Sequence, residues 1–215
     1  MARLVPKWRK QPERKTLIAN PQQFEQAMAL FDAANAADPN LDEGQPKELL
    51  YARRMSEMIG RFAPRASEVA QLAVRAQHIR RWMVPRSSYP MTKPGYHAWR
   101  SGLYTFHAET AGELMRQAGY DAALIEQVMA AVSKSDIRAN ADTQLLEDVS
   151  SLVFMEHYML AFAAQHPEYS EDKWIVIIRK TWRKMSAEAQ AFATGGGIRL
   201  PESLLPVIRK AIAVS

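Results

Sequence analysis

An imidazole, an amide, two guanidiniums and an indole lie within six residues in the run QHIRRW at 77–82, and Arg86 follows shortly after. An imidazole transfers protons near neutral pH and binds metals. Guanidiniums bind phosphate or carboxylate through paired hydrogen bonds. The run predicts a polar site in which His78 is an acid–base group or metal ligand. Gln77, Arg81 and Arg86 are its candidate ligand-binding residues.

A second pair of polar residues lies on a predicted helix that starts at Pro94 and ends at Gly119. Arg100 and His107 are seven residues apart, or two helical turns, and both fall on the apolar face. An unpaired charge in a protein interior costs several kcal/mol, so Arg100 needs an anionic partner. The pattern leaves open whether that partner is an internal carboxylate or a bound ligand.

Two carboxylates follow on the apolar face of a predicted helix over 143–165. Asp148 and Glu156 are eight residues apart and share that face, whereas Glu147 is predicted to point away from it. Carboxylates on an apolar face need a metal, a cation or hydrogen-bond donors. Asp148 is therefore a candidate metal ligand and Glu156 a candidate general base. Internal salt bridges to the arginines above are the structural alternative.

The elements that position these residues are predicted to be helices throughout. Prolines at helix starts and apolar residues at helical spacing support this prediction, although residues 174–178 are rich in β-forming residues and leave a local strand open. The fold class is all-α, a single bundle of about seven or eight helices. The predicted segments are a basic N-terminal arm over 1–20, a helical domain over 21–194 and a glycine-hinged C-terminal helix over 195–215.

The composition narrows the classes of partner. With 215 residues, 47% of them hydrophobic, the chain can bury a core, and no apolar run is long enough for a membrane span. The absence of cysteine excludes disulfides and thiolate chemistry. The net charge of +5 is spread along the chain and forms no basic stripe of the kind that nucleic acids need. We expect a cytoplasmic protein with a small anionic ligand, and a homo-oligomer stays open.

Several longer segments resemble an uncharacterised family of HD-like all-α proteins, known only as a domain of unknown function. The resemblance covers roughly residues 31–186 and implies no activity. It is carried by Glu48-Leu-Leu-Tyr51-Ala-Arg53-Arg54-Met55, Gln77-His78-Ile-Arg80-Arg81-Trp82, Pro85-Arg86, Tyr89-Pro90, Gly95-Tyr96, Trp99-Arg100, Phe106-His107-Ala-Glu109, Gly119-Tyr120, Leu146-Glu147-Asp148-Val149, Lys180-Thr181-Trp182 and Lys184-Met185-Ser186.

Some relatives in that family carry the label glutamyl-tRNA synthetase. The last of these segments, residues 184–186, echoes a loop of class I synthetases. The chain has neither a parallel-sheet nucleotide-binding pattern nor a His-Ile-Gly-His element, so we reject that label.

More distantly, the order of polar elements is similar to that of the HD superfamily of metal-dependent phosphohydrolases. His107 and Asp148 match the superfamily pattern, but Gln77 stands where it has histidine, His78 where it has aspartate, and Tyr51 near its first histidine. The resemblance implies hydrolysis of a small, phosphorylated substrate with a divalent metal such as Mn, Fe, Zn or Mg. The changed positions leave an alternative, a catalytically degenerate fold that binds an anionic ligand or a protein.

Together, the residues and the resemblance assign these roles. The catalytic candidates are His107, Glu156 and His78; the ligand-binding candidates are Arg81, Arg86, Arg100, Gln77 and Lys180; the metal-ligand candidates are His78, His107 and Asp148.

Overall fold

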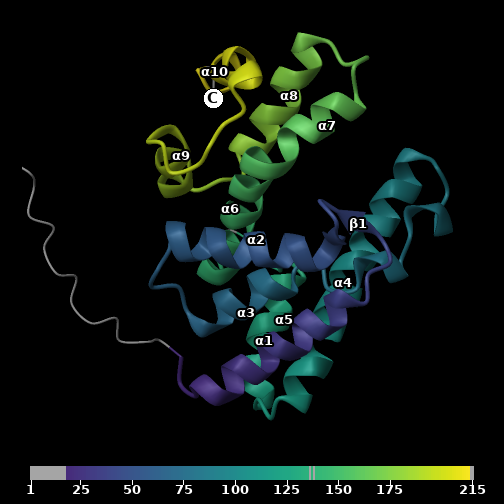
Figure 1. Ribbon diagram of the computed structural model, residues 1–215, viewed down its shortest axis with the longest axis vertical. Coiled ribbons are helices and arrows are strands. Elements are labelled where there is room, and N and C mark those ends of the chain that lie inside the picture. The colour runs from purple at the N-terminus through teal and green to yellow at the C-terminus, as the bar shows by residue number, and fades with distance from the viewer. Residues whose placement is uncertain (1–17, 136, 138, 214–215) are drawn as a thin grey trace, which may run out of the picture.

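The computed structural model describes residues 18–135, 137 and 139–213, so the predicted arm over 1–20 lies almost wholly outside the described residues. The described part is helical apart from one small hairpin, which confirms the all-α class (Figure 1). Its α-helices are α1 (Pro21–Ala36), α2 (Lys47–Phe62), α3 (Glu68–Ala76), α4 (Lys93–Gln117), α5 (Ala122–Val132), α6 (Ala141–Val153), α7 (Met159–Gln165), α8 (Glu171–Trp182), α9 (Ala187–Thr194) and α10 (Leu205–Ile212).

Shorter elements join these helices. Strands β1 (Leu41–Asp42) and β2 (Gln45–Pro46) pair antiparallel before α2. Single 3₁₀ turns are η1 (Arg81–Met83), η2 (Arg86–Ser88) and η4 (Glu202–Leu204), and η3 (Phe154–Tyr158) is a turn of π-helix between α6 and α7.

Ten α-helices in the described residues exceed the predicted seven or eight. The helix predicted over 143–165 is divided by the π turn η3, and α9 was not predicted. Helix α9 is only eight residues long and rich in alanine, so it has no apolar periodicity to detect. The segment 174–178, for which a strand was open, lies within α8.

Side-chain caps set the starts of most helices. In each case an oxygen of the preceding residue accepts a hydrogen bond from a backbone N–H in the first turn, which satisfies a donor that the helix leaves unpaired. The capping residues are Asn20, Ser67, Thr92, Asp121, Asn140, Ser170 and Ser186.

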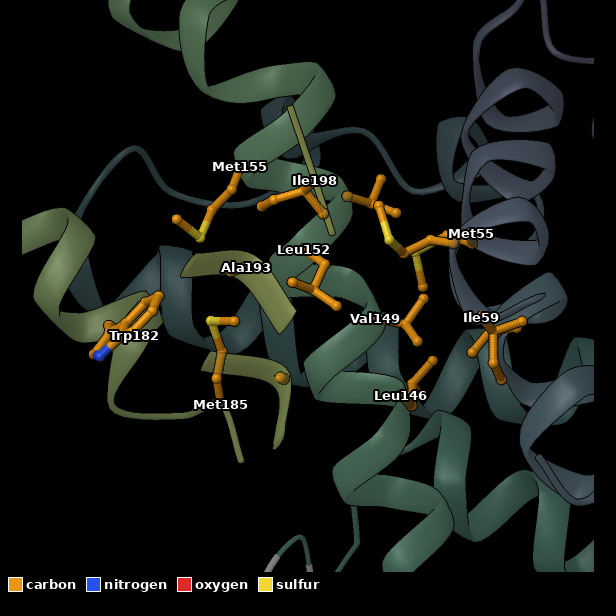
Figure 2. Close-up of a cluster of buried hydrophobic side chains, with 14 of the residues drawn as sticks. Met55, Ile59, Leu146, Val149, Leu152, Met155, Trp182, Met185, Ala193 and Ile198 are labelled. Atoms are coloured by element: carbon orange, nitrogen blue, oxygen red, sulfur yellow. The ribbon is translucent and has the colours of Figure 1, made fainter. Parts of the chain in front are cut away.

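Two apolar clusters hold the helices together, and α3 contributes to both. One cluster joins α3 to α1, α4 and α5. The other joins α2 and α3 to α6 and to the C-terminal helices, which lie at the opposite end of the molecule from α1 (Figure 1). Figure 2 shows the α6 side chains of this second cluster between those of α2 and those around the end of α8: Leu146, Val149 and Leu152 lie between Met55 and Ile59 on one side and Trp182 and Met185 on the other.

The C-terminal segment after Gly195 packs against this second cluster. Gly195 follows the last turn of α9, and Gly196 has a φ of +83°, which suits glycine because it has no Cβ. Ile198 and Ile208 are buried in the cluster. The segment over 195–213 is thus part of the packed structure.

Among the described residues, no helix combines the length and apolar character needed to cross a bilayer.

Candidate functional site

Two adjoining cavities lie between α2, the end of α3, α4 and the α6–η3 helix. The first, here the site cavity, has a volume of about 480 Å³, and the second cavity about 460 Å³. They share five lining residues: Tyr51, His78, Arg81, Ser150 and Phe154. The site cavity is further lined by Gln77, Tyr96, Trp99, Arg100, Leu103, Tyr104, His107, Val132, Lys134, Glu147, Ser151, Thr181 and Lys184.

His107 on α4 ties that helix to the end of α3. Its Nδ1 lies 2.8 Å from the backbone carbonyl oxygen of Ile79, which can only accept, so Nδ1 carries the hydrogen. Its Nε2 is buried and has no hydrogen-bond partner among the described residues. Burial and the neighbouring His78 lower the pKa of His107 to about 3. The imidazole is therefore neutral near pH 7.

The segment after α3 ends in a backbone turn at Arg80. After this turn the chain continues along the site cavity. Arg80 has a φ of +51°, in the left-handed region that non-glycine residues seldom adopt. Its backbone N–H donates to Oδ1 of the buried Asn35, 3.1 Å away. Asn35 on α1 and His107 on α4 thus hold consecutive residues of one turn, and the next residue, Arg81, lines both cavities.

His78 and Tyr51 form a stacked pair between the two cavities. Their ring centroids are 4.2 Å apart and the planes differ by 14°. The Tyr51 hydroxyl donates to Oε1 of Gln77 at 2.8 Å, so Tyr51, Gln77 and His78 lie together. Burial and the charge of Arg81 lower the pKa of His78 well below its ordinary value, so this imidazole is also neutral near pH 7.

Glu48 is a buried carboxyl beside His78 that the sequence did not identify as a site residue. Its Oε2 lies 3.4 Å from Nδ1 of His78, and it lines the second cavity. Burial raises its pKa to about 7, against the opposing effects of Arg81 and Lys47. A carboxyl that titrates near neutral pH next to an imidazole can exchange protons with it.

Glu147 lines the site cavity, and the prediction that it points away is wrong. Its carboxylate pairs with Nζ of Lys134 at 2.5 Å and of Lys184 at 3.2 Å. Burial alone would raise its pKa, but the two ammonium groups lower it below its ordinary value. The helical-wheel prediction failed because α6 is covered on both faces, so the face opposite its apolar side does not meet solvent.

Asp148 lies outside both cavities and anchors the start of α9. Its carboxylate accepts hydrogen bonds from the backbone N–H of Ser186 at 2.7 Å, from the Ser186 hydroxyl at 2.6 Å and from Gln144 at 3.0 Å. The structure brings His78 and His107 together, with ring centroids 5.9 Å apart, but not Asp148 with them. In residues 18–135, 137 and 139–213, no three His, Asp or Glu side chains are grouped so that they could hold a metal.

The predicted residues Glu156, Lys180 and Arg86 also line neither cavity. Glu156 on η3 pairs with Arg61 at 3.0 Å. Lys180 is exposed on α8. None of the three can contact a ligand in the cavities as they stand.

The three predicted arginines divide into two groups. Arg86 closes its own loop by donating to backbone carbonyl oxygens of residues 89, 90 and 92. Arg81 lies over the Trp99 ring, 4.8 Å from its centroid, and Arg100 donates to the Tyr104 hydroxyl at 2.7 Å. Neither Arg81 nor Arg100 has a carboxylate partner among the described residues. They are the cations of the site that form no ion pair with a carboxylate among the described residues, although the charge of Arg81 acts on the nearby Glu48 carboxyl.

Neither lysine of the site was predicted from the sequence as a site residue. Lys134 follows α5 in the left-handed conformation, with a φ of +59°, and Lys184 follows α8. Single lysines near helix ends are usually solvated, so only the tertiary structure reveals their role. Glu48 and Lys184 did have a signal, since each lies in a segment that carries the family resemblance.

Fold and site together define an all-α protein with a cation-lined internal cavity. The model of the family described as Domain of unknown function (DUF4202) matches residues 25–208. This match spans most of the 215 residues, so the chain belongs to that family and the predicted membership is confirmed. No curated protein and no solved structure matches the chain.

We expect Asp148 to stabilise the folded protein. Asp148→Ala removes the acceptor of three hydrogen bonds and should lower the free energy of unfolding by about 3 kcal/mol. Ser186→Ala should cost about 1 kcal/mol through loss of the α9 cap. Because the two residues share one interaction, the double variant should lose less than the sum of the single losses. Urea denaturation of the four proteins measures this, and additive losses would contradict the structure.

Glu48 should give the protein a pH-dependent stability. The folded protein binds its proton more tightly, since the pKa is about 7 instead of 4.5. The resulting stability is present below pH 4.5 and is lost as pH rises through 7. Relative to Glu48→Gln, the wild type should lose up to about 3 kcal/mol of unfolding free energy over this range. Urea denaturation of both proteins from about pH 5 to about pH 8 measures the difference, and a constant difference would contradict the assignment.

Proposed function

We propose that this protein binds a small phosphate-bearing compound in the site cavity and hydrolyses its phosphate ester. The observation that carries the proposal is the pair Arg81 and Arg100, whose guanidiniums contact aromatic and hydroxyl groups and form no ion pair with a carboxylate among the described residues. Lys134 and Lys184 add two positive charges to the lining and Glu147 removes one, so four cations and one anion leave +3. Guanidiniums and ammoniums hold phosphate oxygens by charge-assisted hydrogen bonds. A doubly charged phosphate group would satisfy most of this excess.

Glu48 and His78 are the proton-transfer groups of this proposal. With Nδ1 of His78 facing Glu48, its Nε2 lies on the other side of the ring and has no partner among the described residues. A water molecule would give a proton to Nε2 while its oxygen bonds to phosphorus, and the ester P–O bond would break on the opposite side. The departing alcohol oxygen would take a proton from solvent water, and the imidazolium would return its proton to solvent. The Glu48 carboxylate would stabilise the imidazolium. Arg81 and Arg100 would stabilise the charge on the phosphoryl oxygens.

The divalent metal that the HD resemblance implies does not fit this set of residues. The predicted ligand Asp148 is held by Ser186 and Gln144, away from His78 and His107. The carboxylate that does line the site cavity, Glu147, is neutralised by two lysines. The proposal therefore includes no step through a metal.

A second candidate function is a binding module without catalysis. It is favoured by the state of His107, whose Nδ1 is bonded to a backbone carbonyl and whose Nε2 is buried. Only one of the two neighbouring imidazoles, that of His78, is exposed enough to meet a substrate. The cationic lining would then recognise an anionic ligand, or an acidic group of a protein, and leave it unchanged.

We predict that Arg81→Gln weakens binding of inorganic phosphate at least about tenfold, because each hydrogen bond to a charged group contributes about 1.5–3 kcal/mol. Arg65→Gln is the matched control, since Arg65 is exposed and lines neither cavity. Isothermal titration calorimetry at constant salt compares the variants with the wild type. Equal losses in the two variants would mean that phosphate responds only to net charge, and the proposed site would be incorrect.

Hydrolysis is tested with a panel of phosphate esters that includes 4-nitrophenyl phosphate. We expect His78→Gln to lower kcat at least about a hundredfold, the usual contribution of a general base, with little change in phosphate affinity. His166→Gln is the control, because His166 pairs with Glu168 and lines neither cavity. Phosphate binding without turnover of any ester by the wild type would favour the binding module instead.

A further inference from the structure

One continuous helical segment lines both cavities. Helix α6, the π turn η3 and α7 follow one another without a break from Ala141 to Gln165. Residues along it, from Glu147 on α6 to Gln165 on α7, line the two cavities. The lining changes along the segment: Glu147 and Ser151 line the site cavity, Ser150 and Phe154 line both cavities, and Tyr158, Ala161, Phe162 and Gln165 line the second cavity.

The second cavity has aromatic walls. Tyr51 and Tyr158 have ring centroids 5.8 Å apart on one side, and Phe154 and Phe162 have centroids 6.0 Å apart. All four side chains are partly exposed, so their rings are available to a ligand. Aromatic side chains bind flat rings through offset-stacked or edge-to-face contacts.

The two cavities also differ in the net charge of the residues that line them. With the shared Arg81 counted in each, the second cavity has two cations, Arg81 and Lys47, and one carboxyl, Glu48, which leaves +1 against the +3 of the site cavity. A second phosphate would meet the Glu48 carboxyl there. An uncharged ring with few polar groups suits this lining, as is usual for cavities that bind small molecules.

The two cavities meet at the groups that carry the proposed chemistry. His78 and Arg81 line both, and Phe154 at the start of the π turn also lines both. Turns of π-helix inside longer helices are frequent at functional sites. A ligand that extends from one cavity into the other would pass directly beside His78.

We propose that the ligand has two parts, a phosphate group held in the site cavity and a flat aromatic ring held in the second cavity. This inference rests on the proposed function for the placement of the phosphate. The ring could be carbocyclic and joined directly to the phosphate, or heterocyclic and joined through a sugar. Both present the same flat apolar faces to the aromatic walls.

The test compares three phosphate monoesters by isothermal titration calorimetry on the intact protein: 1-naphthyl phosphate, a nucleoside 5′-monophosphate and glycerol 2-phosphate. Burial of a ring should make at least one of the first two bind at least about tenfold tighter than glycerol 2-phosphate. The tighter of the two identifies the kind of ring.

Two matched variants locate the ring. Ala161 is exposed on α7 and lines the second cavity, so Ala161→Trp should fill that cavity and remove the preference for the ring. Ala164 is exposed on the same helix and lines neither cavity, so Ala164→Trp should keep the preference. Circular dichroism checks that both variants fold. Phe162→Ala, which removes one aromatic wall, should also weaken the preference.

Each other result would overturn the inference in a recognisable way. Equal affinity of the wild type for all three esters would overturn the two-part ligand and leave the proposed function standing. A ring preference that survives in Ala161→Trp would place the ring elsewhere. Failure of all three esters and of inorganic phosphate to bind would overturn the proposed function as well.

Discussion

The hydrogen bond between the Nδ1–H of His107 and the carbonyl of Ile79 determines how the rest of the site is built. It joins α4 to the segment after α3 in a buried place where a lost partner would cost about 1–3 kcal/mol. Asn35 fixes the next residue through the N–H of Arg80. Between them, these bonds hold a left-handed backbone turn that unsupported residues seldom adopt. The turn leaves Gln77, His78 and Arg81 along one cavity.

The same bond explains why the two histidines have different roles in our proposal. His107 is fixed as one neutral tautomer by a backbone acceptor, and its other nitrogen is enclosed. His78 is more open, stacks on Tyr51 and faces a carboxyl whose pKa lies near 7. One imidazole is thus a structural support, and the other is placed between two cavities where a ligand can reach it.

Some charged side chains of the site form ion pairs with one another, and others form none among the described residues. Glu147 is held by Lys134 and Lys184, from two segments that are far apart in the sequence, and this group closes one side of the site cavity. Arg81 and Arg100 are held by aromatic and hydroxyl groups, which orient guanidiniums without neutralising them. Cations that are oriented but not neutralised in a partly enclosed site are suited to bind an anion.

Local patterns in the sequence were enough to place His78, Arg81, Arg100 and His107 around one site. Arg100 and His107 lie two turns apart on α4, and His78 and Arg81 follow the end of α3. Local patterns failed for the carboxylates of α6. On that helix the wheel gave Asp148 to the site and Glu147 to solvent, whereas packing on both faces reverses the two roles. The positions of Lys134 and Lys184 depend on how distant helix ends meet, and a single sequence contains no periodic signal for that.

Some helix boundaries were likewise predictable from the sequence and others were not. Starts marked by a capping side chain or a proline, such as those of α1 and α5, were predictable from local chemistry. The π turn after α6 was not, since its residues continue the apolar pattern of a regular helix. Membership of the family was predictable from the segments around these positions, and the family match confirms it.

The most direct measurement is a crystal structure of the protein soaked with tungstate, a heavy analogue of phosphate that can be located by its anomalous scattering. We predict one tungstate ion in the site cavity, within hydrogen-bond distance of the Arg81 and Arg100 guanidiniums. A cavity without tungstate, with both guanidiniums paired to carboxylates of the protein, would contradict the proposal.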